Sequence, residues 1–164
     1  MRRVLPLFIL VALLAFPVAA GARVSGTRDT NGMLSIERGR GTVDLQARGA
    51  VIAQIRKGKV KVKIYKGRHR RDRQTIIRMR GAGTMRRLSD GTLVYDGKNI
   101  RIRIVDQHFR VQIKGVGIHL SAVAIGQVTL QADPNAADPG VFSINLADYQ
   151  PLPELATTYQ LSGS

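Results

Sequence analysis

The basic residues are the side chains whose type and spacing most clearly suggest chemistry. In "KVKVKIYK", which begins at Lys59, lysines alternate with Val60, Val62 and Ile64, so the ammonium groups share one face of a strand. A basic loop, "KGRHRRDR", follows, and arginines alternate in the same way after residue 100. Such groups bind phosphate and carboxylate, arginine often through two parallel hydrogen bonds. The candidate anion-binding residues are Lys59, Lys61, Lys63, Lys66, Arg68, Arg70, Arg71, Arg73, Arg101, Arg103 and Arg110.

This positive charge is local. Residues 56–87 hold 14 of the 26 basic residues and a single acid, Asp72, whereas residues 115–164 hold four acids and neither lysine nor arginine. Lysine on a strand also keeps a sheet soluble and discourages edge pairing, which would account for the three alternating lysines. It does not account for 14 basic residues in 32 positions, because they repel one another. The distribution favours an anionic partner.

The composition limits which anion this is. Tyr65 is the only aromatic residue in the basic block, so the stacking platform typical of single-stranded nucleic-acid binding is missing. We therefore expect no sequence-specific nucleic acid. The expected partner is an anionic polymer of the cell envelope, such as a phosphate polymer or an acidic glycan, or the headgroups of anionic lipids. A homo-oligomer is a further expectation.

Catalytic and metal-binding patterns are weak. The chain has no cysteine, and its three histidines lack the spacing of a metal site. His69 lies in the basic loop, and His108 and His119 are expected on successive strands more than ~10 Å apart. A hydrolase-type enzyme would use Asp96 or Asp106 with His108, and we rank this third. We expect no cofactor.

The dominant hydrophobic signal from Met33 onward has period two, in runs of five to seven residues interrupted by Gly or Asp. No apolar stripe of helical period persists between residues 24 and 145. The pattern predicts an all-β domain, a single antiparallel sandwich or barrel of about ten short strands, with a short β-solenoid as the alternative. Residues 39–47 resemble residues 115–122, by chance or through an internal duplication.

The segment 99–114 predicts a hairpin. With Asp106 and Gln107 as a two-residue turn, Ile104 would face Phe109 and the apolar side chains would share one face. Arg103 would then lie opposite Arg110, a destabilising like-charge pair.

The termini differ from this domain. Arg2, Arg3 and the apolar run 4–20, followed by small residues, predict a signal peptide over residues 1–22, with an uncleaved anchor as the alternative. Its removal lowers the formal net charge from +15 to +13 by taking away the two arginines. Residues 23–32 are expected to be a flexible linker and 33–164 one domain. The excess of arginine over lysine suggests a GC-rich bacterial source.

Residues 132–164 are expected to form an irregular acidic segment of that domain. Asp133 and Asp138, each followed by proline, could offer oxygens to Ca²⁺ but more often form turns. The predicted signal peptide indicates a secreted or extracytoplasmic protein, cell-surface association included.

The first hypothesis for the function is an exported, non-catalytic β-domain protein that binds anionic envelope or extracellular polymer through a basic strand face. The alternative is a structural or self-assembling envelope module.

Overall fold

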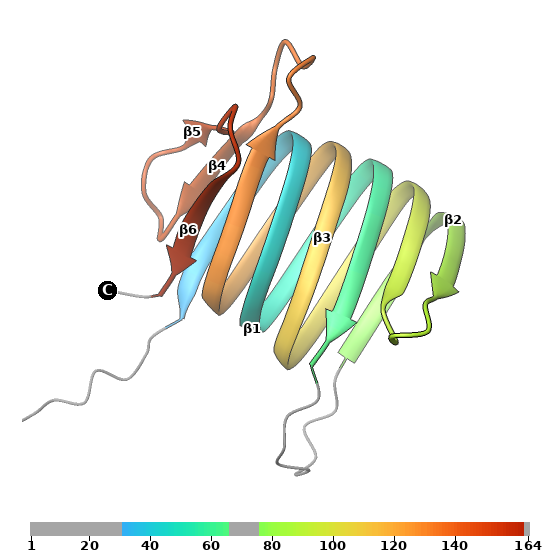
Figure 1. Cartoon of the computed structure of the whole chain (residues 1–164). Helices are drawn as coiled ribbons and strands as arrows, with labels where there is room; N and C mark the ends of the chain where they lie inside the picture. The colour runs from blue at the N-terminus through green and yellow to red at the C-terminus, as the bar shows by residue number, and fades with distance from the viewer. Residues whose placement is uncertain (1–30, 66–75, 163–164) are drawn as a thin grey trace, which may run out of the picture.

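The computed structural model describes residues 31–65 and 76–162, apart from the side chains of residues 106 and 107 (Figure 1). This part of the chain is all-β, as predicted, and its strands form one antiparallel sheet that does not close. The six strands are β1 (Gly32–Ile64), β2 (Ile76–Arg87), β3 (Leu93–Ala132), β4 (Val141–Ile144), β5 (Gln150–Pro151) and β6 (Thr157–Leu161). Within the described ranges no helix is long and apolar enough to cross a membrane.

The two long strands wind together as a flattened coil (Figure 1). Val43 of β1 pairs with both Ile113 and Leu130 of β3, and Ile55 pairs with both Ile100 and Ile118. Each stretch of β1 therefore lies between two stretches of β3. The flattening gives the coil two broad faces with a shared interior.

We name the two faces by their basic residues. The lysine face comprises residues 42–46, 59–63, 84–87, 93–96, 109–114 and 126–131, together with β6. The arginine face comprises residues 33–37, 50–55, 76–80, 100–105 and 118–123, together with β4.

The core lies between these faces and is almost entirely aliphatic. Val60 and Val62 are buried while the lysines that alternate with them point outward, which confirms the predicted alternation. Ile100, Ile102 and Ile104 are buried from the other face. Burying each such side chain stabilises the fold by about 1.5–3 kcal/mol, which matters in a chain without disulfides.

A row of glycines forms one edge of the coil, where the chain turns from one face to the other. Across neighbouring strands the pairs are Gly83–Gly97, Gly97–Gly58, Gly58–Gly115 and Gly115–Gly41. A Cβ on Gly58 would collide with the carbonyl oxygen of Lys114 and lie 2.8 Å from the Cα of Gly115. The backbones thus approach too closely for any other residue. We call this row the glycine corner.

The two ends of the coil differ. At one end β4, β5, β6 and their connecting loops cover the last turns, with Leu152 and Leu161 buried and the rings of Phe142 and Tyr159 5.1 Å apart. Asn145 fixes this end, since its side-chain amide donates to the Ser162 carbonyl at 2.8 Å. At the other end β2 is the last strand of the sheet and pairs only with β3 in the described part.

Two predictions about the strands were wrong. The expected ten short strands are stretches of fewer, much longer ones, because the chain keeps its ladder pairing while it bends at the corners. The barrel is excluded because the sheet is not closed. The strands form a single sheet, wound so that two faces enclose one core.

The prediction of a hairpin with its turn at Asp106 and Gln107 was also wrong. β3 continues through these residues, and Phe109 pairs with Ala47 and Ile64 rather than with Ile104. The strand already has partners on both sides, so it bends around the coil without folding back on itself.

The predicted signal peptide and most of the linker 23–32 lie outside the described residues, as does the basic loop 66–75. The strand begins at Gly32, one residue before the expected start of the domain.

Candidate anion-binding face

The structure divides the candidate residues between the two faces. Lys59, Lys61, Lys63 and Arg110 lie on the lysine face, whereas Arg101 and Arg103 lie on the arginine face. The lysines of residues 59–63 and the arginines of residues 101–103 therefore do not form one continuous cationic surface. The remaining candidates, Lys66, Arg68, Arg70, Arg71 and Arg73, lie outside the described residues.

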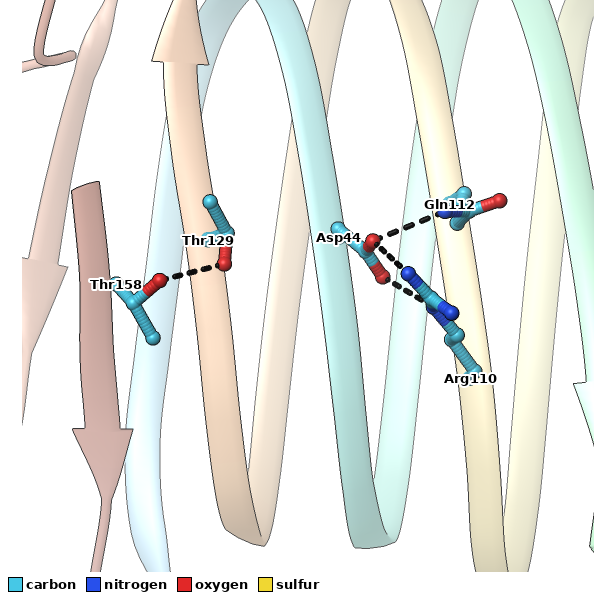
Figure 2. Close-up of polar contacts among 5 residues, drawn as sticks. All are labelled: Asp44, Arg110, Gln112, Thr129 and Thr158. Atoms are coloured by element: carbon cyan, nitrogen blue, oxygen red, sulfur yellow. Dashed lines mark hydrogen bonds and ion pairs between the residues drawn. The ribbon is translucent and has the colours of Figure 1, made fainter. Parts of the chain in front are cut away.

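On the lysine face, Arg110 is bound by a carboxylate. Its Nη2 and Nε donate to Asp44 at 2.6 and 2.9 Å, and Gln112 donates to the same carboxylate at 2.9 Å (Figure 2). These hydrogen bonds, that from Arg110 above all, hold the pKa of Asp44 below its usual value despite partial burial. The bidentate pair occupies the guanidinium edge that an anionic ligand would need.

Two of the three lysines are also paired with acids. Lys59 lies 3.1 Å from Asp96, and Lys63 lies 3.0 Å from Asp90. The backbone N–H of Thr92 donates to Asp90 at 3.0 Å, and with the Lys63 hydrogen bond this lowers the pKa of Asp90 to about 2. Three of the four candidates on this face therefore have carboxylate partners, and its cationic character is reduced accordingly.

The arginine face presents a different arrangement. Arg78 lies directly opposite Arg103, and Arg80 lies directly opposite Arg101, on the adjacent strands β2 and β3. We call these four residues the arginine grid. All four are exposed, and no carboxylate among the described side chains lies within 4.0 Å of their guanidinium groups. Directly opposed side chains have Cβ atoms only about 4.5–5.5 Å apart, so these like charges repel one another.

The strands below hold this grid in place. Ile102 and Ile104 are buried beneath it, and Ile77 and Met79 pack against the same core. Next to the grid, the Tyr95 hydroxyl donates to the Gly81 carbonyl at 2.6 Å and ties β2 to β3 at a register shift between Arg80 and Ala82. The grid thus carries four like charges on two strands, β2 and β3, that cannot easily separate.

A hollow of about 650 Å³ opens beside the grid, next to the glycine corner. We call this hollow the corner hollow. Arg101 belongs both to the grid and to the corner hollow. Its polar lining consists of Arg38, Arg40, Gln54, Arg56, Asn99, Arg101, His119 and Asp138. Among the described residues that line the hollow, Asp138 supplies the one carboxylate, which lies 3.7 Å from Nη1 of Arg38, with both side chains about two-thirds exposed.

Unusual backbone conformations shape the hollow. Arg38 and Asn99 have φ values of 53° and 50°, and Gly117 has a φ of 65°. Non-glycine residues rarely adopt this left-handed region, which is enriched at binding sites. The Arg56 side chain lies over Gly117, where a Cβ would come within 2.8 Å of the Cβ of Arg56. The backbone conformations at Arg38, Asn99 and Gly117 therefore determine where Arg38 and Arg56 leave the backbone.

Sequence reasoning missed Arg38, Arg40, Arg56, Arg78 and Arg80 as site residues. The alternation of Arg78 and Arg80 in "TIIRMR" was a readable signal for two outward arginines on one strand. Nothing in the sequence indicated that Arg38 and Arg56 would lie beside Arg101, because their proximity depends on how the coil winds.

The structure separates one of the two predicted catalytic pairs, Asp96 with His108. Asp96 pairs with Lys59 on the ladder, and the carbonyl of His108 accepts a hydrogen bond from the N–H of Tyr65. Six residues of strand separate these two partners, or about 20 Å, so Asp96 and His108 cannot act together. The side chain of Asp106 is not described. Among the described residues no group of three or more His, Asp or Glu side chains is placed to hold a metal ion.

Asp133 and Asp138 form turns. Asp133 accepts a hydrogen bond from the N–H of Asn135 at 3.1 Å, and Asp138 accepts one from the N–H of Gly140 at 3.0 Å. Each side chain thereby stabilises the loop that borders the corner hollow.

In comparisons with known proteins, no family model, no curated protein and no solved structure matches this chain.

Proposed function

We propose that this protein is an exported, non-catalytic β-domain protein that binds an anionic polymer of the cell envelope or the extracellular space. The observation that carries the proposal is the arginine grid, four exposed guanidinium groups on two neighbouring strands without a described carboxylate partner. Such an arrangement costs stability through repulsion. A polyanion lying across it would remove that cost.

The contrast between the faces favours the arginine face as the binding surface. Three of the four predicted cations on the lysine face have acids beside them. Among the described residues, Asp138 is the one carboxylate in the grid and the adjoining hollow, which together present Arg38, Arg40, Arg56, Arg78, Arg80, Arg101 and Arg103. Arginine binds phosphate and carboxylate through two parallel hydrogen bonds, which suits a polymer that repeats such groups.

A second candidate is a self-assembling envelope module. It is favoured by the position of β2 as the outermost strand of the sheet, since an unpaired strand edge can accept a strand from another chain. β2 carries Arg78, Arg80, Arg86 and Arg87, whereas the opposite end of the coil lies in the acidic part of the chain. A second copy could therefore pair head to tail.

The test compares two variants with the same loss of charge. The grid variant carries Arg78→Gln, Arg80→Gln, Arg101→Gln and Arg103→Gln. The control carries Lys59→Gln, Lys61→Gln, Lys63→Gln and Lys114→Gln, which lie on the lysine face. Retention on purified cell envelope is measured between 50 and 200 mM salt, with phosphate polymer, acidic glycan and anionic lipid vesicles as competitors.

The grid variant should bind at least roughly 30-fold more weakly at low salt, since each exposed charge contact contributes about 0.5–1 kcal/mol. Its salt dependence should also be shallower, because fewer counterions are released on binding. The control should keep most of its affinity. Equal losses in both variants would mean that only net charge matters, and would refute the assignment to this face. Salt-dependent oligomers in light scattering, with unchanged retention, would favour self-assembly.

A further inference from the structure

The corner hollow differs in kind from the flat grid beside it. A volume of about 650 Å³ lies within the ordinary range for small-molecule sites, and is large enough for one or two sugar units. The arginines of the grid lie side by side on the surface of the sheet. A polymer could lie across the grid while one of its units enters the hollow.

The lining combines two kinds of polar group. Arg38, Arg56 and Arg101 supply guanidinium donors for an anionic group. Gln54 and Asn99 carry amides, which both donate and accept hydrogen bonds, as sugar hydroxyls require. A hollow meant only for a simple anion would need the first kind of group and not the second.

The backbone preorganises this lining. Arg38 and Asn99 both adopt left-handed conformations next to the hollow, and Arg56 is held over Gly117. Strain of this sort persists where the surrounding structure enforces it, and it fixes the direction in which each side chain leaves the backbone before a ligand arrives.

The Asp138 carboxylate would compete with an anionic ligand for Arg38. Its carboxylate lies 3.7 Å from Arg38 and comes from the loop that follows β3. The pair is exposed and therefore weak, so a stronger anion can replace it. Removing the carboxylate should then raise affinity for an anionic ligand.

We infer that the corner hollow is a subsite for a single anionic sugar unit, carboxylated or phosphorylated, with Arg38, Arg56 and Arg101 binding the anionic group and Gln54 and Asn99 binding hydroxyls. This inference rests on the proposed function, because the unit is one repeat of the polymer that the grid binds. It adds chemical specificity to a surface that would otherwise recognise charge alone.

The probes are glucuronic acid, glucose 1-phosphate, glucose and inorganic phosphate, titrated into the full chain in its exported form and followed by ¹⁵N amide shifts. One or both charged sugars should give saturable shifts at Arg38, Arg56, Asn99 and Gly117. Glucose should give none at the same concentrations. The more tightly bound charged sugar identifies the carboxylated or the phosphorylated unit as the natural one.

Three variants of exposed side chains test the roles. Arg56→Gln should weaken binding of the charged sugar about tenfold, and Asp138→Asn should strengthen it about two- to threefold. Arg78→Gln, which removes the same single charge from the grid, should change it less than twofold. The subsite is refuted if glucose or inorganic phosphate binds as tightly as the charged sugars, if the shifts map to the grid, or if no charged sugar binds below 20 mM.

The two proposals fail separately. If the grid variant loses polymer binding while no sugar enters the hollow, the proposed function stands and the subsite is wrong. If charged sugars bind in the hollow while polymer retention is the same in the grid variant and the lysine-face control, the hollow is a site but the grid is not the polymer surface.

Discussion

Replacing Gly58 with alanine should strongly destabilise the fold, because Gly58 lies in the middle of the glycine corner. The new Cβ would collide with the Lys114 carbonyl oxygen and lie 2.8 Å from the Gly115 Cα and 3.2 Å from the Lys114 carbonyl carbon. All three atoms belong to the backbone of the neighbouring stretch of β3, so no side chain can rotate to relieve the contact.

The expected loss of folding stability follows from the hydrogen bonds that must weaken and the strain that must remain. Separating the strands at this point would weaken one or two ladder hydrogen bonds, at about 1 kcal/mol each, and would leave residual strain of about 1–2 kcal/mol. The expected loss is about 3 kcal/mol, or roughly 10 °C in Tm for a domain of this size. It would be measured by urea and thermal unfolding followed by far-ultraviolet circular dichroism.

Gly91→Ala is the control. A Cβ there meets nothing within 4 Å, and only the positive φ of 81° opposes it, so the loss should be about 1 kcal/mol. If the two variants lose equal stability, close packing of backbones does not determine the shape of the coil at this corner.

Two further predictions concern the acids that pair with lysine-face cations and the hydroxyl next to the grid. Asp44 and Asp90 both have lowered pKa values, that of Asp90 at about 2, so their contribution to stability is complete above the ordinary carboxyl pKa of 3.8 and is lost as the pH falls through their folded values. The double variant Asp44→Asn, Asp90→Asn should therefore lose stability at pH 6 and show a smaller further loss between pH 4 and 2 than the wild type in urea unfolding, and an unchanged pH dependence would contradict this. Tyr95→Phe removes the hydrogen bond to the Gly81 carbonyl, which should cost about 1 kcal/mol and speed amide exchange in β2 but not in β4. Exchange that rises equally in both strands would mean that the hydroxyl does not act locally on β2.

Alternation was enough to predict which side chains face the core. Val60, Val62 and the isoleucines of residues 100–104 are buried, and the basic residues between them point outward, because a strand exposes alternate side chains whatever its partners are. Glycine interrupts the alternating runs in the sequence, and Gly41 and Gly115 occupy the glycine corner.

The winding of the strands could not be predicted in the same way. A bend at residues 106–107 and a two-residue hairpin give similar local patterns, and only the pairing of Phe109 with Ala47 and Ile64 distinguishes them. The site depends on that winding. It places Arg103 opposite Arg78 rather than Arg110, and it sends the alternating lysines to the other face, where Asp90 and Asp96 meet them.

The most direct test of the proposed binding face is a side-chain footprint of the wild-type protein on its polyanion. The protein is labelled with an arginine-specific and a lysine-specific reagent, with and without envelope polymer at low salt, and the labelled positions are read by mass spectrometry. Protection of Arg78, Arg80, Arg101 and Arg103, with Lys59, Lys61 and Lys63 labelled as before, is the expected result. Protection of the three lysines with the four arginines still reactive would contradict the account.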